Sequence, residues 1–235
     1  MLSIEAINVS IQSSHILRNV TLEVGNGQVV CLIGRNGAGK TTTFRTIMGY
    51  IKPESGIIRF NGDDIIKKKT HEIGRIGVGF SPEDSGIFPD LKCHENIKLS
   101  TWARKVNRST EERIKLAYEV FHVLENYKDR RGDQVSGGER KMLSIARAIA
   151  LDAKLLLLDE PFEGLAPALI TKVAESIHKI IKMGPSIFIS ESNIYHVPDF
   201  TDKLYVIERG EIIFSGKPEE LRDNNSVLRI VAGTA

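Results

Sequence analysis

An α/β fold with a mainly parallel sheet is the architecture that this sequence predicts, and three observations predict it. Residues 28–33 are apolar from the second position onward and have glycine on both sides, as expected for a strand buried on both faces of a sheet. Residues 155–158 are four consecutive leucines. Helical patterns follow both runs, so strands alternate with helices as they do around parallel sheets.

The N-terminal part of the chain predicts an antiparallel β subdomain. Residues 2–11 and 16–24 alternate in part between apolar and polar side chains, and the polar residues 12–15 separate them as a turn. A helix is expected from Thr42, where apolar residues follow at helical spacing as far as Ile51. Residues 53–56 end this helix before a strand at 57–60.

A helical lobe is expected at about residues 84–154, inserted into an α/β core made of residues 1–83 and 155–235, so that the chain is one two-lobed domain. Ser109 and Glu112 form a capping box at the start of an amphipathic helix. The apolar residues on its stripe are Ile114, Ala117, Tyr118, Phe121 and Leu124. We interpret this stripe as core. The lobe ends with a helix that reaches about Leu151.

The α/β core resumes after the leucine run. A helix is expected at 167–183 and a strand at 186–190. Residues 203–215 predict a hairpin that turns at Arg209 and Gly210, and short helices are expected from Pro218.

Composition excludes several classes of protein. Lys and Arg number 32 against 30 Asp and Glu, a formal net charge of +2, so no nucleic-acid partner is expected. Lys67, Lys68 and Lys69 are interpreted as a solvated face. Cys31 and Cys93 are the only cysteines and lack metal-ligand spacing, which suits a reducing cytoplasm. With no signal peptide and no apolar run near ~20 residues, the chain is expected to reach a membrane only through a partner.

A glycine-rich loop at residues 34–41 follows the first buried strand and opens a helix. In this pattern backbone N–H groups point at nucleotide phosphates, Lys40 reaches the β and γ phosphates, and Thr41 ligates Mg²⁺. The helix adds its N-terminal dipole. The loop residues that we expect to bind the nucleotide are Asn36, Gly37, Ala38, Gly39, Lys40, Thr41 and Thr42.

Two carboxylates follow the leucine run. In a fold with a phosphate-binding loop, Asp159 at the end of this strand holds Mg²⁺ through the hydration shell of the ion. Glu160 is then free to polarise the attacking water, which makes it the candidate general base. The alternative is an exposed acidic turn after a core strand.

Residues 136–139, Ser-Gly-Gly-Glu, are the third motif that this chain shares with a known protein family. Together with the loop and the two carboxylates, they make the chain similar to the ATP-binding subunits of ABC transporters over essentially its whole length. The resemblance implies ATP hydrolysis coupled to transport, with ATP and Mg²⁺ as cofactors. It implies that two such domains stack head to tail, so that Ser136 and Gly138 bind ATP in trans. It also implies integral membrane permeases as partners, at the inner face of the membrane.

Further motifs resemble the subgroup that serves branched-chain amino acid uptake, which also uses an extracytoplasmic solute-binding protein. They lie at residues 34–37, 80–83, 87–89, 95–96, 164–167 and 227–233. Uptake systems for urea or related amides share several of them, so this alternative stays open.

Four residues depart from the wider family pattern. Ile11 stands where an aromatic side chain usually stacks on adenine, unless it is core and a neighbour covers the base. Glu83 stands where a glutamine usually contacts Mg²⁺ and the attacking water. Ser192 stands where a histidine holds the γ-phosphate, with His196 as an alternative source of that group, and Ala166 replaces an aspartate. Ile11, Ser192 and Ala166 indicate slow turnover by this subunit alone, and hence a non-identical second ATPase subunit.

Two alternatives to a transport function are compatible with the motifs. A non-transport ABC ATPase acting on DNA or ribosomes would need a long coiled-coil insertion, a tandem domain or a basic patch, and none is visible in the sequence. A nucleotide-dependent binding module with little hydrolysis is the second rival. The presence of Lys40, Asp159 and Glu160 argues against it.

Overall fold

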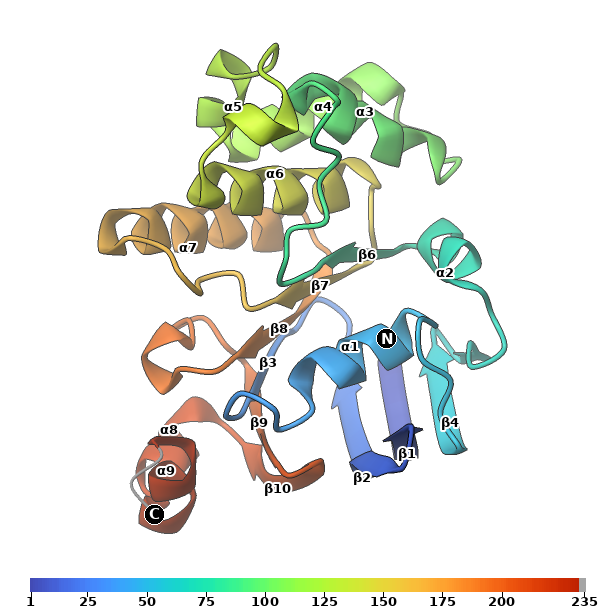
Figure 1. Ribbon diagram of the computed structural model, residues 1–235, viewed down its shortest axis with the longest axis vertical. Coiled ribbons are helices and arrows are strands. Elements are labelled where there is room, and N and C mark those ends of the chain that lie inside the picture. The colour runs from blue at the N-terminus through green and yellow to red at the C-terminus, as the bar shows by residue number, and fades with distance from the viewer. Residues whose placement is uncertain (233–235) are drawn as a thin grey trace. The chain divides into compact units, whose positions relative to one another are not determined.

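The computed structural model describes residues 1–232, so Gly233, in the last of the subgroup-like motifs, lies outside the described residues. The chain divides into two compact units (Figure 1). The first combines Met1–Ile73 with the chain from Ser186 onward, and the second is Gly74–Pro185. The expected helical lobe falls within the second unit, and its boundaries of about 84 and 154 stay a prediction.

The first unit contains the expected antiparallel β subdomain. Its strands are β1 (Leu2–Ile11), β2 (Ser14–Val24), β4 (Ser55–Phe60) and the short β5 (Asp63–Asp64), in the order β2-β1-β4-β5. The turn between β1 and β2 is shorter than predicted. Because Ile11 pairs with Ser14, only residues 12 and 13 remain outside the two strands.

A second sheet in the same unit carries the glycine-rich loop. Strand β3 (Val29–Ile33) lies parallel to both β8 (Ser186–Glu191) and β9 (Lys203–Glu208), and β9 forms an antiparallel hairpin with β10 (Glu211–Gly216). Every residue of β3 is buried, as expected of a strand with neighbours on both edges and packing on both faces. The predicted α/β class with a mainly parallel sheet is confirmed.

The helices of the first unit are α1 (Lys40–Ile47), α8 (Pro218–Arg222) and α9 (Asn225–Ala232). Helix α1 begins two residues earlier and ends four residues earlier than predicted. Its end is set by Gly49, whose φ of 72° lies in the left-handed region that glycine adopts without strain. Helix α2 (Thr70–Ile76), which was not predicted, runs across the boundary between the units.

The second unit pairs two parallel strands with five α-helices. The strands are β6 (Val78–Ser81), which was not predicted, and β7 (Leu155–Asp159). The helices are α3 (Cys93–Trp102), α4 (Thr110–Val120), α5 (His122–Asn126), α6 (Gly137–Ala150) and α7 (Pro167–Lys182). Helix α6 packs against α3, α4 and β6 (Figure 1).

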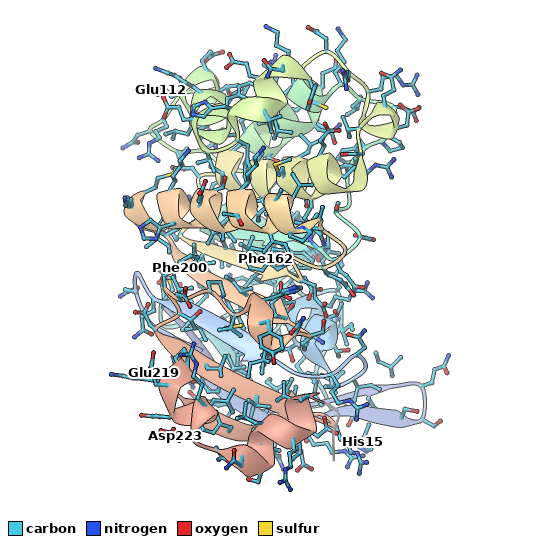
Figure 2. The ribbon with its side chains drawn as sticks, turned by 90° about the vertical axis from the view of Figure 1, so that its left-hand side faces the viewer. His15, Glu112, Phe162, Phe200, Glu219 and Asp223 are labelled. Carbon is cyan, nitrogen blue, oxygen red and sulfur yellow. The ribbon has the colours of Figure 1, made fainter. Side chains whose placement is uncertain are left out.

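The predicted capping box forms at the start of α4. The Glu112 backbone N–H donates to Ser109 Oγ at 3.2 Å, and the Ser109 N–H donates to Glu112 Oε2 at 2.6 Å. Glu112 is labelled in Figure 2. The apolar stripe is buried and belongs to the core. The prediction of one continuous helix was wrong, because the backbone leaves the helical region at Phe121, with φ −120° and ψ 70°. Leu124 therefore lies on the separate helix α5.

Within the described part of the chain, no helix combines the length and the apolar character needed to span a membrane.

Candidate phosphate-binding and catalytic site

The phosphate-binding loop, residues 34–41, joins β3 to α1 in the first unit. Lys40 is only 4 % exposed. Its ammonium group donates to the carbonyl oxygens of Gly34, at 2.7 Å, and Arg35, at 3.2 Å. These two bonds hold the cation over its own loop, where the nucleotide phosphates are expected to bind.

The end of the loop requires glycine. Gly39 has φ 115°, and a Cβ there would lie 2.7 Å from Leu17 Cδ2. The close approach of β2 and the left-handed backbone therefore both exclude a side chain. Gly39 is also the N-cap residue of α1, whose first turn contains no acidic residue. The N-terminal end of the helix dipole is thus left for an external anion.

The second unit carries the predicted carboxylates. Asp159 is the last residue of β7, and Asp159 and Glu160 are 1 % and 3 % exposed. The alternative of an exposed acidic turn is therefore wrong. Glu160 has φ 48°, in the left-handed region that costs a non-glycine residue of order 1–3 kcal/mol. A strained, buried carboxylate is typical of a functional position.

Glu83 and Glu160 lie in one acidic neighbourhood of this unit. The pKa of the Glu163 carboxyl is raised, first by partial desolvation and then by the charges of Glu160 and Glu83. Lys141 also belongs to this neighbourhood, because its Nζ donates to the Glu83 carbonyl oxygen at 2.8 Å. The structure thus brings together the two acidic residues that the sequence assigned to water activation and to Mg²⁺.

The signature residues begin helix α6. Ser136 Oγ accepts from the Glu139 N–H at 3.3 Å, and Glu139 Oε2 accepts from the Ser136 N–H at 2.7 Å. This capping box gives both residues a structural role within the chain. A Cβ on Gly138 would lie 2.6 Å from Leu169 Cδ1, so helix α7 also restricts this position. Ser136 and Gly137 are exposed, as a contact in trans requires.

Ser192 lies beside the phosphate-binding loop. It lines a pocket of about 660 Å³ in the first unit. The other described lining residues are Arg35, Asn36, Gly37, Ala38, Glu208, Arg209, Val231 and Ala232. The alternative residue His196 instead places its Nδ1 3.3 Å from Oε2 of the fully buried Glu191. The geometry therefore favours Ser192 over His196 at this position.

The pocket contains residues to which the sequence assigned no role in nucleotide binding. Arg209 lies in the turn between β9 and β10, Glu208 is the last residue of β9, and Val231 and Ala232 come from α9. The hairpin turn itself was predicted, but no motif indicates that it returns to the loop.

Ile11 ends β1 and is 43 % exposed, so it is not part of the core. We expect Ile11→Tyr to tighten ATP binding, because an aromatic ring stacks on a base whereas a branched aliphatic side chain does not. Stacking is worth ~1–3 kcal/mol per base, or ~5- to 150-fold in affinity. Equilibrium titration with ATP measures the change. Ile213→Tyr, at an exposed isoleucine of β10, is the matched control, and equal affinities for both variants would contradict the assignment.

Comparison with known proteins gives a family match and two sequence relatives. The family model described as ABC transporter matches residues 17–163. The chain is 32 % identical over 235 residues to the lipopolysaccharide export system ATP-binding protein LptB of Haemophilus influenzae, covering 99 % of this chain and 97 % of the relative. It is 34 % identical over 221 residues to LptB of Escherichia coli K12, covering 93 % and 91 %.

Two solved structures are similar over nearly the whole chain. The ADP conformation of MJ1267, an ATP-binding cassette of an ABC transporter, has a TM-score of 0.83 at 26 % identity, covering 99 % of this chain and 98 % of that one. The structure of cbiO1 from Clostridium perfringens, part of the ABC transporter complex cbiONQ, has a TM-score of 0.80 at 27 % identity, covering 98 % and 93 %.

Proposed function

From the premise that this chain belongs to the ABC transporter family and is one of its ATPases, we propose that it hydrolyses ATP at sites shared with a second cassette. The observation that carries the proposal is the phosphate-binding loop, with Lys40 held over Gly34 and Arg35. In this proposal the loop and helix α1 bind the phosphates, and Lys40 neutralises the β and γ phosphates. Glu160 polarises the attacking water.

Mg²⁺ is the metal that this chemistry uses. Thr41, Asp159 and Glu83 offer one hydroxyl and two carboxylates, and these hard oxygen donors fit Mg²⁺. No group of three or more His, Cys, Asp or Glu among the described residues could hold a metal. Mg²⁺ is usually bound through one or two carboxylates and obtains its other ligands from water and phosphate. When bound, Mg²⁺ would neutralise phosphate charge.

The second cassette completes the site. Ser136 and Gly138 would contact ATP bound to the loop of the partner, and the exposed start of α6 supports this. The partner is proposed to be a non-identical ATPase, because Ile11, Ser192 and Ala166 weaken what this chain offers ATP on its own loop. Co-purification tests this: a complex with two different ATPase subunits is expected, and full-rate hydrolysis by this chain alone would contradict it.

The transported solute is proposed from motif similarity. Residues 80–83, 87–89 and 164–167 resemble the branched-chain amino acid uptake subgroup, which favours an importer that uses permeases and an extracytoplasmic binding protein. The names of the LptB relatives favour a second candidate, the export of lipopolysaccharide. Urea or amide uptake is the remaining alternative.

Reconstitution with the native permeases separates these candidates. The complex is isolated with its membrane partners and placed in liposomes, and its ATPase rate is measured with leucine plus binding protein, with urea, and with lipopolysaccharide. Stimulation by leucine is expected. Stimulation by lipopolysaccharide alone would establish the second candidate, and ATP hydrolysis that no membrane partner or solute affects would favour a non-transport ATPase.

Glu83→Gln is expected to relax the dependence of ATP binding on Mg²⁺. The Glu83 carboxylate is exposed, so its repulsion of a nearby phosphate is screened, and we expect metal-free affinity to rise only ~2- to 10-fold. Titrations with and without Mg²⁺ measure this. Asp84→Asn, at the adjacent exposed carboxylate, is the matched control, and a metal dependence equal to that of wild type would contradict a role for Glu83.

A further inference from the structure

We propose that Arg209 is a further phosphate-binding residue of this ATPase, and that its guanidinium group contacts the terminal phosphate of ATP. The inference rests on the proposed function, since it takes ATP as the ligand of the loop. The turn between β9 and β10 carries Arg209 and lies beside the phosphate-binding loop.

Hydrogen bonds fix this turn against the loop. The Gly210 N–H donates to the carbonyl oxygen of Ala38 at 2.9 Å, and the Arg18 N–H donates to the carbonyl oxygen of Gly210 at 2.8 Å. Gly210 has φ 83°, and a Cβ there would overlap the carbonyl oxygen of Ile16. The turn is therefore held between the loop and β2, and no side chain fits at Gly210.

The Arg209 side chain is positioned on that turn but remains solvated. Its own φ of 45° lies in the left-handed region, and 89 % of its side chain is exposed. The ion pair that the structure describes for it is a loose one, with Nε 3.7 Å from Oε1 of the neighbouring Glu208. Such a guanidinium group can form charge-assisted bonds to a phosphate without first breaking a strong internal pair.

The pocket has the character of an anion site. Two arginines, Arg35 and Arg209, and one carboxylate, Glu208, line the pocket together with Asn36 and Ser192. Helix α9 lies against β9 (Figure 1). Its residues Val231 and Ala232 line another side of the same pocket. The pocket thus combines a net positive charge with the hydroxyl and amide donors that phosphate oxygens accept from.

Arg209 has the positive charge and the additional hydrogen-bond donors that Ser192 lacks. The resemblance to the family places the residue at 192 at the γ-phosphate, but a serine hydroxyl offers one donor and never carries a positive charge. Arg209 shares the pocket with Ser192 and adds five donors with a permanent charge. A contact to the γ-phosphate distinguishes ATP from ADP, and this distinction makes the inference testable.

The test compares ATP and ADP affinities of the purified chain, measured with fluorescent nucleotide analogues. Arg209→Gln is expected to weaken ATP binding ~5- to 20-fold, the size of one charge-assisted hydrogen bond at an accessible site, and ADP binding less than ~2-fold. Arg209→Lys should retain part of the ATP affinity. Glu208→Gln should tighten ATP binding ~2- to 3-fold, because it removes a like charge. Arg222→Gln, at an exposed arginine of α8 outside the pocket, is the matched control.

Lys40→Ala separates failure of this inference from failure of the proposed function. If Lys40→Ala binds ATP at least ~10-fold more weakly than wild type, while Arg209→Gln matches wild type, Arg209 has no phosphate contact and the proposed function stands. If wild type itself binds no ATP, both fail. An equal loss of ATP and ADP affinity in Arg209→Gln would also overturn the inference, because it would indicate a displaced loop rather than a lost contact to the terminal phosphate.

Discussion

Replacing Glu160 with glutamine is expected to lower the rate of ATP hydrolysis by ~10²- to 10⁴-fold, the usual contribution of a general base. The change keeps the shape of the side chain, which matters because Glu160 is 3 % exposed and has a left-handed backbone. ATP affinity should be unchanged, so the variant should accumulate as an ATP-bound dimer. Phosphate release by the assembled complex measures the rate, and size-exclusion chromatography with ATP detects the dimer.

Glu163→Gln is the control for this prediction. Glu163 lies three residues away in the same turn and in the same acidic neighbourhood, but it is exposed and no role in water activation is assigned to it. A loss of rate of similar size in both variants would indicate that the charge of the neighbourhood matters rather than a base at Glu160. No phosphate release by either variant or by wild type, even with permeases present, would favour the nucleotide-dependent binding module.

Lys40→Ala is expected to weaken ATP binding by ~10- to 150-fold. The estimate follows from ~1.5–3 kcal/mol for hydrogen bonds from a charged donor. Binding should be weakened for ADP as well as ATP, because Lys40 reaches both the β and the γ phosphate. Equilibrium titration with each nucleotide measures the change.

Because Lys40 is buried and donates to two loop carbonyls, its removal could also disturb the fold. A thermal melt followed by circular dichroism checks for this, and Lys52→Ala, at an exposed lysine that follows α1, is the matched control. If Lys40→Ala melts like wild type and binds ATP with wild-type affinity, Lys40 is not a phosphate ligand.

Much of the fold could be predicted from local sequence. The apolar runs at β3 and β7 are buried at every residue, because only a strand covered on both faces tolerates such a run. The capping box at Ser109 depends on residues three positions apart, and it forms as predicted. The glycine loop and the pair Asp159 and Glu160 were likewise found from short motifs.

Other elements depend on contacts that the local sequence does not contain. Strand β6 has a weak pattern, Val-Gly-Phe-Ser, and is a strand because Val78 pairs with Leu155 and Ser81 with Leu158. The break at Phe121 interrupts an apolar stripe that is continuous at helical spacing. At β6, pairing with a distant strand overrides the weak local preference.

In the candidate site, too, some residues could be predicted from local sequence and others only from contacts between distant segments. The sequence by itself determined which residues form the phosphate-binding loop, the pair of carboxylates and the signature, because each is a short motif whose chemistry requires those residue types at that spacing. Only the tertiary structure decided that Ser192 and Arg209 share one pocket with Arg35 and Asn36. More than 150 residues separate these groups along the chain, and parallel pairing of β3 with β8 and β9 brings their ends to one edge of the sheet.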